Sequence, residues 1–339
     1  MTVVTDKLNM RYGGSEKGIS YLDFSGEGLI CLYGGEASGK TTLLKCIAGL
    51  ENYEGKVIVN GRERQAEADG GIIMLFDDYG LFGNKTALFN AAYPYLVRKS
   101  DKAEALRQAD ELLKKAGIYA KRSEKAKNLS DKEKLMLALT RLERGAELYL
   151  IDNPLKRFCG EERKKLFFSV MYPVLQRLGE NADVIYATDD LSELEALQES
   201  VLLINFGSRK GTGKLGDLMK NPPNLFCAGL MSDKVIFEAR LSADGTCPHI
   251  AFGEEKILLP QEGRLLDEDY RGKTVKVSAD CEAGADGGLT AVAQGCGYLS
   301  FEGCVFRSKL AENLLKNEKI DINLTNICLY DYVSEGRIY

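Results

Sequence analysis

The chain has 339 residues, enough for about two domains. Its net charge of -5 gives no electrostatic reason to expect nucleic acid as a partner. Nine cysteines occur without a C-x-x-C pair, so we expect free thiols in a reducing compartment and neither a zinc site nor a disulfide framework. No apolar run approaches the ~18 residues of a membrane span, and the first residues lack a basic-then-apolar leader, so we expect neither a transmembrane helix nor a secretion signal.

Short apolar runs predict buried strands along the first two thirds of the chain. In order they cover residues 29–33, 55–61, 72–76, 148–151, 184–187 and 201–204. Residues 1–12 are expected to form an edge strand, and helical composition or spacing covers 86–144, 160–178 and 191–199. This alternation of strands and helices predicts an α/β fold with a mostly parallel sheet and helices on both faces.

A phosphate-binding motif follows the strand at 29–33. It matches G-x-x-x-x-G-K-[ST] and consists of Gly34, Gly35, Glu36, Ala37, Ser38, Gly39, Lys40, Thr41 and Thr42. Between a strand and a helix, such a loop surrounds a phosphate chain with backbone N–H groups. We expect Lys40 to reach the β- and γ-phosphates and the Thr41 hydroxyl to hold Mg²⁺. An accidental glycine-rich turn is the alternative, but the flanking elements favour nucleotide binding.

Two residues elsewhere fit the same ligand. Asp152 ends the buried strand at 148–151, where the crevice of a parallel sheet lies, so it is expected to anchor Mg²⁺ from the second side. The alternative is an ordinary strand-ending Asp in a turn. Tyr12 precedes Gly13-Gly14, and it is either an aromatic that stacks on a purine or a half-buried strand tyrosine.

In this order the motifs resemble those of the nucleotide-binding subunits of ABC transporters. The matching pieces are the adenine-stacking Tyr12, the Walker A loop Gly34–Thr42, the Q-loop at 76–82, the signature at 129–133, Walker B at 148–154 and the switch position at 188–190. Residues 213–230 and 326–336 are similar to the linker and the final segment of the maltose-type, sugar-uptake importer ATPases. The resemblance implies ATP and Mg²⁺ as ligands, and membrane permease subunits and a second nucleotide-binding subunit as partners. It also implies a cytoplasmic location on the inner face of the cell membrane.

The same resemblance divides the chain into a P-loop NTPase domain (1–231), which has a helical subdomain at about 86–145, and a C-terminal domain (232–339). Short strand-like runs with glycine-rich turns in the second part predict a small all-β barrel of the OB or TOBE type. These runs are 235–241, 256–259, 273–277, 289–292 and 298–306. No basic-aromatic face is present, so nucleic acid is not expected there. The family's Arg-Pro-Glu-Asp stretch is reduced to Val277–Asp280.

Three positions of the nucleotide site depart from the family pattern. Asp77 stands where members carry Gln; its oxygens are still suitable for Mg²⁺, although a turn-forming Asp pair is equally consistent. Asn153 stands where members carry the Glu that polarises the attacking water, and an amide cannot accept a proton, a loss that typically costs ~10²–10⁴-fold. Asp189 occupies the switch-histidine position, and the single histidine, His249, lies in the C-terminal domain. We interpret Asp189 as structural, since residues 188–190 suit the N-cap of the next helix.

The signature is the fourth departure. Members use a Ser and two glycines to grip the nucleotide of the opposite subunit, whereas Ser130 is followed here by Asp131, Lys132 and Glu133. Ser130 and Glu133 have the spacing of a capping box, which gives the helix a local reason for this sequence. The side chains at 131 and 132 are expected to keep a phosphate away from the backbone.

The four departures point in one direction: the ATP cradle is kept and the hydrolytic residues are not. We therefore favour a catalytically weak ATP-binding subunit of an importer, paired with a complete partner rather than with itself. Two alternatives stay open: a working ATPase in which Asp77 or Asp189 replaces the missing base, and an ATP-binding regulatory protein without a transporter. Carbohydrate is the solute that the resemblance suggests, while polyamines, metals and phosphorus compounds are carried on the same scaffold.

Overall fold

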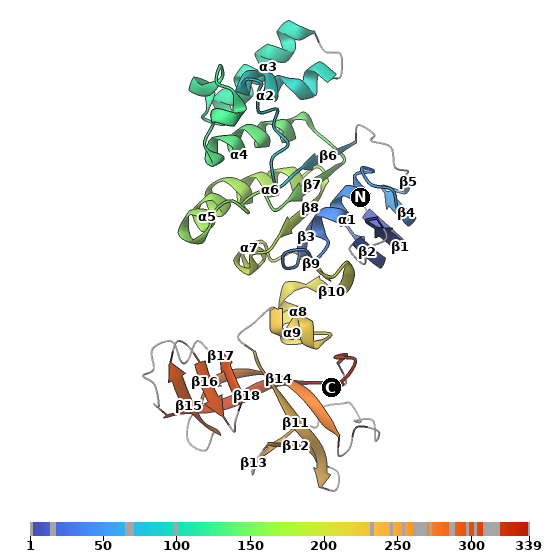
Figure 1. The fold of residues 1–339 in the computed structure, drawn as a ribbon, viewed down its shortest axis with the longest axis vertical. Coiled ribbons are helices and arrows are strands. Elements are labelled where there is room, and N and C mark those ends of the chain that lie inside the picture. The colour runs from blue at the N-terminus through green and yellow to red at the C-terminus, as the bar shows by residue number, and fades with distance from the viewer. Residues whose placement is uncertain are drawn as a thin grey trace. The chain divides into compact units, whose positions relative to one another are not determined.

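The structure is a computed structural model that describes residues 3–13, 18–64, 71–97, 101–230, 234–244, 247–252, 255–259, 270, 273–284, 289–295, 298–301, 304–307 and 319–337. It divides into two compact units, Met1–Thr212 and Gly213–Tyr339 (Figure 1). None of the helices in the described part of the chain combines the length and apolar character that crossing a membrane requires.

The centre of the first unit is a sheet with parallel pairings, as the apolar runs predicted. Its strand order is β10-β9-β3-β8-β7-β6, and the pairs β9–β3, β3–β8, β8–β7 and β7–β6 are parallel. The strands are β3 (Leu29–Tyr33), β6 (Ile72–Leu75), β7 (Leu148–Asp152), β8 (Asp183–Thr188), β9 (Ser200–Asn205) and β10 (Ser208–Lys214). Every residue of β3, β7 and β8 is buried, which explains their continuous apolar sequences.

A second, antiparallel sheet was not predicted. Its order is β2-β1-β4-β5, formed by β1 (Val3–Arg11), β2 (Gly18–Gly26), β4 (Glu54–Val59) and β5 (Arg62–Arg64). The prediction of an edge strand at residues 1–12 is wrong, because β1 pairs with β2 on one side and β4 on the other. Helix α1 (Lys40–Ile47) contributes Leu43, Leu44 and Ile47 to the apolar core that this sheet shares with the parallel one.

The helical segment predicted at 86–144 forms a cluster of its own (Figure 1). It contains α2 (Ala87–Val97), α3 (Lys102–Lys115), α4 (Asp131–Leu139) and the short 3₁₀ segments η1 (Tyr119–Lys121), η2 (Ala126–Asn128) and η3 (Thr140–Arg144). Small and aliphatic side chains such as Ala91, Leu113 and Leu137 form its core. The predicted helix at 160–178 is α5 (Gly160–Leu166), a π-helical turn η4 (Phe167–Met171) and α6 (Tyr172–Gly179), and the helix predicted at 191–199 is α7 (Leu191–Leu197).

The second unit confirms the predicted β-rich C-terminal region. Its sheet has the order β13-β12-β11-β14-β18-β15-β16-β17. The strands are β11 (Val235–Asp244), β12 (Cys247–Phe252), β13 (Glu255–Leu258), β14 (Thr274–Ala283), β15 (Leu289–Gly295), β16 (Tyr298–Phe301), β17 (Cys304–Arg307) and β18 (Lys319–Tyr330). The run predicted at 298–306 is thus two strands, and the predicted runs did not include β12 and β18.

The boundary between the two units lies after Thr212, whereas the predicted boundary lies between 231 and 232. Helices α8 (Leu215–Lys220) and α9 (Leu225–Leu230) belong to the second unit. The reason is packing: Ala228 of α9 is fully buried with Cys328 and Tyr330 of β18. A backbone bridge between Asn224 and Gly336 ties the same segment to the end of the chain.

Candidate functional site

The phosphate loop joins β3 to α1, and two of its glycines are required by their surroundings. A Cβ atom on Gly34 would lie 2.4 Å from the carbonyl oxygen of Ile204, too close for any other residue. Gly39 has φ 106°, a conformation that side-chain-bearing residues rarely adopt. The hairpin between β9 and β10 supports the loop, because the N–H of Gly207 donates to the carbonyl of Ser38 at 2.8 Å.

Lys40 is the first residue of α1, and its ammonium group lies inside the curve of the loop. Its Nζ donates to the carbonyl oxygens of Gly34 at 2.6 Å and Gly35 at 2.7 Å. Burial lowers the pKa of Lys40, and the negative charges of Asp189 and Asp152 oppose that shift. The middle of the loop, Gly35–Ala37, is exposed to solvent, so a phosphate chain can approach its backbone and the lysine together.

Asp152 ends β7 and is almost completely buried. Burial raises the pKa of Asp152, and the nearby Thr41 hydroxyl opposes that shift. Asp152 Oδ2 is buried without a hydrogen-bond partner in the described part of the chain. A buried carboxylate oxygen of this kind costs free energy unless a ligand satisfies it. Asp152 and Thr41 therefore fit Mg²⁺, a hard cation that prefers oxygen ligands and would neutralise phosphate charge there.

Asp77, two residues beyond β6, has a partner within the chain. The Lys156 ammonium donates to its Oδ2 at 3.1 Å, and both side chains are partly exposed. This hydrogen bond raises the pKa of Lys156. The charge of Asp77 also contributes to the raised pKa of Asp152. Because β6 and β7 are parallel neighbours, the predicted metal candidates Asp77 and Asp152 lie at the same edge of the sheet.

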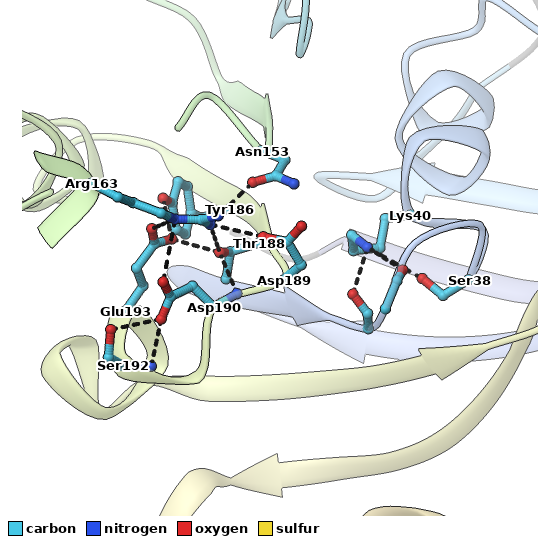
Figure 2. Close-up of polar contacts among 12 residues, drawn as sticks. Ser38, Lys40, Asn153, Arg163, Tyr186, Thr188, Asp189, Asp190, Ser192 and Glu193 are labelled. Carbon is cyan, nitrogen blue, oxygen red and sulfur yellow. Dashed lines mark hydrogen bonds and ion pairs between the residues drawn. The ribbon is translucent and has the colours of Figure 1, made fainter. Parts of the chain in front are cut away.

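The Asn153 and Asp189 side chains are brought together by a residue that the sequence reading did not single out, Arg163 of α5 (Figure 2). Its Nη2 lies 2.8 Å from Asp189 Oδ1 and donates to Asn153 Oδ1 at 3.3 Å. Burial alone would raise the pKa of Asp189, but the charge and hydrogen bond of Arg163 hold that pKa below its usual value. Asn153 has φ 39°, a left-handed conformation that asparagine adopts more readily than most residues.

The other groups around Arg163 are the buried carboxylate of Glu193 and the hydroxyls that bind it. Arg163 Nε lies 2.8 Å from Glu193 Oε1, and Glu193 also accepts hydrogen bonds from Tyr186 at 2.7 Å and Thr188 at 2.5 Å. Burial by itself would lower the pKa of Arg163, but Glu193 and Asp189 raise it, so the guanidinium stays charged. Asp190 is the N-cap of α7, accepting from the N–H of Ser192 at 2.9 Å.

The capping box predicted at the signature segment is confirmed. The N–H of Glu133 donates to Ser130 Oγ at 3.3 Å, and the N–H of Ser130 donates back to Glu133 Oε2 at 2.8 Å. Asp131 lies 3.6 Å from both Lys134 Nζ and Arg157 Nη1, and Lys132 is exposed.

Tyr12, which was predicted either to stack on a purine or to be a half-buried strand residue, is exposed. Its hydroxyl donates to Glu51 at 3.3 Å.

A cavity of about 350 Å³ lies elsewhere in the first unit, lined by Leu112, Met136, Val170 and Pro173 among others. No residue of the phosphate loop lines it. The candidate site is therefore defined by the loop and its strand-end carboxylates, and not by this cavity.

Residues 20–156 match the family model described as "ABC transporter". Over these residues the chain is similar to ABC transporter ATPase domains. Its fold agrees with a solved structure, the dimeric post-hydrolysis state of the ATP-binding cassette MJ0796 bound to ADP and Pi. That match has a TM-score of 0.53 at 20% sequence identity and covers 63% of this chain and 98% of the other.

Curated proteins that are similar to this chain are import ATP-binding proteins. The trehalose import protein SugC of Mycobacterium tuberculosis is 30% identical over 261 residues, 74% of this chain. The oligosaccharides import protein MsmX of Bacillus subtilis is 28% identical and covers 73% of this chain and 68% of its own length. The chain spans 65% of the length of SugC. Relatives named for methionine, Fe(3+) and sulfate/thiosulfate import match as well.

Arg163 and Glu193 were missed because charged residues on short helices are usually solvent-facing. A helical wheel carries the signal that could have found them. Leu166 and Phe167, three and four residues after Arg163, are buried, and so is Leu197, four residues after Glu193. Both charged side chains therefore project from the buried face of their helix.

Proposed function

We propose that this chain is the ATP-binding subunit of an ABC importer, and that it holds Mg-ATP at Gly34–Thr42 while hydrolysing it weakly. The names of the relatives, which are import ATP-binding proteins, support the first part. One observation carries the second. Lys40, Thr41 and Asp152 are grouped around the loop, whereas Asn153 and Asp189 are engaged by Arg163.

The alternative of a working ATPase needs a general base, and two carboxylates could serve. Asp189 has a lowered pKa because Arg163 stabilises its charged form, and Asp77 accepts a hydrogen bond from Lys156. The Asp189 carboxylate, stabilised as the anion, is a poor proton acceptor at neutral pH, and Asp77 is already engaged by the Lys156 ammonium. Asn153 has no proton-accepting group at all. We therefore infer that the bound nucleotide acts mainly through its binding energy and the conformation it favours.

The proposal extends to partners. ABC sites form between two nucleotide-binding subunits, and the Ser130–Glu133 capping box uses the polar groups with which a signature would grip a nucleotide. Two copies of this chain would place that segment at both sites, so we favour a heterodimer with a complete second subunit. Membrane permease subunits would hold the pair at the inner face of the cell membrane. Carbohydrate is the proposed solute, on the strength of the sugar-import relatives.

Calorimetric binding of Mg-ATP and phosphate release by the purified chain test the proposal together. We expect the wild type to bind Mg-ATP with phosphate release near background. Lys40→Ala should weaken binding by roughly 10- to 100-fold, because it removes one or two charge-assisted hydrogen bonds to phosphate. Chelation of Mg²⁺ should weaken binding as well. Lys45→Ala is the control, because Lys45 lies on the same helix but pairs at the surface with Glu51.

Two results would count against the proposal. Phosphate release well above background that disappears in Lys40→Ala would make the chain a working ATPase. Equal Mg-ATP affinity of the wild type and Lys40→Ala would remove the nucleotide site itself. Isolation of the chain from its cells tests the partners: permease subunits and a second nucleotide-binding subunit should accompany it.

A further inference from the structure

Arg163 is an unusually enclosed cation at the edge of the candidate site. Only 11% of its side chain is exposed, and three carboxylates surround it. Glu193 and Asp189 each lie 2.8 Å from the guanidinium, and Asp190 lies 3.3 Å away. Its Nη2 also donates to Thr188 at 3.1 Å and Asn153 at 3.3 Å. One side chain from α5 thereby links the ends of β7 and β8 with the first turn of α7.

These partners differ in how they relate to the phosphate loop. Glu193 is buried on the side away from the loop and also binds Tyr186 and Thr188, which makes it a structural partner. Asp189 lies between Arg163 and Lys40 (Figure 2), and its charge acts on the Lys40 ammonium. Among the carboxylates around Arg163, Asp189 is therefore the one whose charge acts on a ligand bound at Lys40.

A carboxylate in that place opposes the binding of a polyphosphate, because like charges repel strongly where water is partly excluded. In this chain the Asp189 carboxylate lies 2.8 Å from Arg163 Nη2, the same nitrogen that donates to the Asn153 amide oxygen. The short Nη2–Oδ1 contact is charge-assisted, so it restrains the carboxylate as well as countering its charge. Arg163 thus offsets the repulsion that Asp189 brings to the loop.

We propose that Arg163 is a positioning residue of the nucleotide site, which neutralises and orients Asp189 so that the loop at Lys40 accepts a magnesium-bound nucleoside triphosphate. This rests on the proposed function, since it presumes that Mg-ATP binds at Gly34–Thr42. It adds a role for a residue outside every motif.

A double-mutant cycle separates this role from simple support of the fold. The dissociation constant of Mg-ATP is measured for the wild type, Arg163→Gln, Asp189→Asn and the double variant. Arg163→Gln should weaken binding about tenfold, Asp189→Asn should leave it equal or tighter, and the double variant should return to within about threefold of the wild type. Arg177→Gln, which breaks the Arg177–Glu143 surface pair, is the matched control and should bind as the wild type does.

A purely structural role predicts a different cycle. Arg163→Gln would then weaken binding by the same factor whether residue 189 is Asp or Asn, and that result would overturn the inference. Unchanged binding in Arg163→Gln would overturn it too. Thermal unfolding of each variant shows that it is folded at the assay temperature; if Arg163→Gln is not, Arg163→Lys replaces it, with a smaller loss that Asp189→Asn must again restore.

The same data distinguish this inference from the proposed function. If the wild type binds no Mg-ATP, both are overturned. If the wild type binds and Lys40→Ala does not, but the cycle shows no coupling between Arg163 and Asp189, the inference alone is overturned. If coupling is found in a chain that proves to hydrolyse ATP rapidly, the role of Arg163 holds and only the weak-hydrolysis proposal is overturned.

Discussion

The two sides of the candidate site differ in whether their buried polar groups have partners within the chain. Beside the loop, Asp152 keeps a buried oxygen that no hydrogen bond satisfies in the described part of the chain. At the end of β8, the cluster around Arg163 contains Glu193, Asp189 and Asn153, and each contacts the guanidinium. A buried polar atom left without a partner points to a ligand, whereas a fully connected network resists change. Asp152 is therefore suited to binding a ligand, whereas the cluster around Arg163 is stabilised by its own contacts.

A second contrast lies between two of the cations that follow β7, Lys156 and Arg163. Lys156 pairs with Asp77 and Arg163 with Asp189, so both of these acidic residues meet a cation from the same stretch of chain. The side chain of Lys156 is 50% exposed, and that of Arg163 is 11% exposed. Exposed pairs contribute little to stability, while breaking a buried pair is costly.

The largest expected effect is on stability. Arg163→Met should lower the free energy of unfolding by ~3–5 kcal/mol, because it leaves the buried Glu193 carboxylate without its cation. Urea unfolding followed by circular dichroism at the helical signal measures it, since α1 to α7 all belong to the first unit. Arg177→Met, at a half-exposed pair with Glu143, should cost at most ~1 kcal/mol. Equal losses in the two variants would remove the contrast between buried and exposed pairs.

The next effect concerns catalysis. Asn153→Glu should raise phosphate release by less than about tenfold, well short of the ~10²–10⁴ that a positioned base contributes. Arg163 lies 3.3 Å from the present amide oxygen and would stabilise the new carboxylate as an anion. The φ of 39° also disfavours Glu more than Asn. Asn153→Gln carries the same backbone cost without the charge and is the control. A gain of a hundredfold or more in Asn153→Glu would show that Arg163 does not restrain this position.

Most of the first unit could be predicted because its strands are continuous apolar runs. Leu29–Tyr33 and Leu148–Ile151 are buried throughout, so composition alone indicates them. The antiparallel sheet was harder. In β1 the polar pair Asp6-Lys7 interrupts the pattern, and the structure has register shifts there, so the sequence does not show that partners lie on both sides. In the second unit, β12 contains Pro248 and His249, which weaken a strand signal.

The candidate site divides in the same way. Lys40, Thr41 and Asp152 could be predicted because a motif and a strand end fix where their side chains lie. The partners of Asp77, Asn153 and Asp189 could not, because Lys156 and Arg163 reach them across the fold and not along the chain. Sequence also suggested any of residues 188–190 as N-cap, and only the structure assigns it to Asp190. Local sequence patterns identify the site residues, and tertiary contacts determine which partners their side chains have.

The smallest expected effect comes from the exposed pair. Lys156→Gln should change both the free energy of unfolding and the Mg-ATP binding free energy by less than ~1 kcal/mol, because its contact with Asp77 is open to solvent and screened by salt. Asp77→Asn should behave alike, and raising the salt concentration should remove what difference remains. If Lys156→Gln instead weakens Mg-ATP binding as much as Arg163→Gln, Lys156 leaves Asp77 for the phosphates when nucleotide binds. Lys156 and Arg163 would then both contribute to binding, and the difference in their burial would not predict their effects.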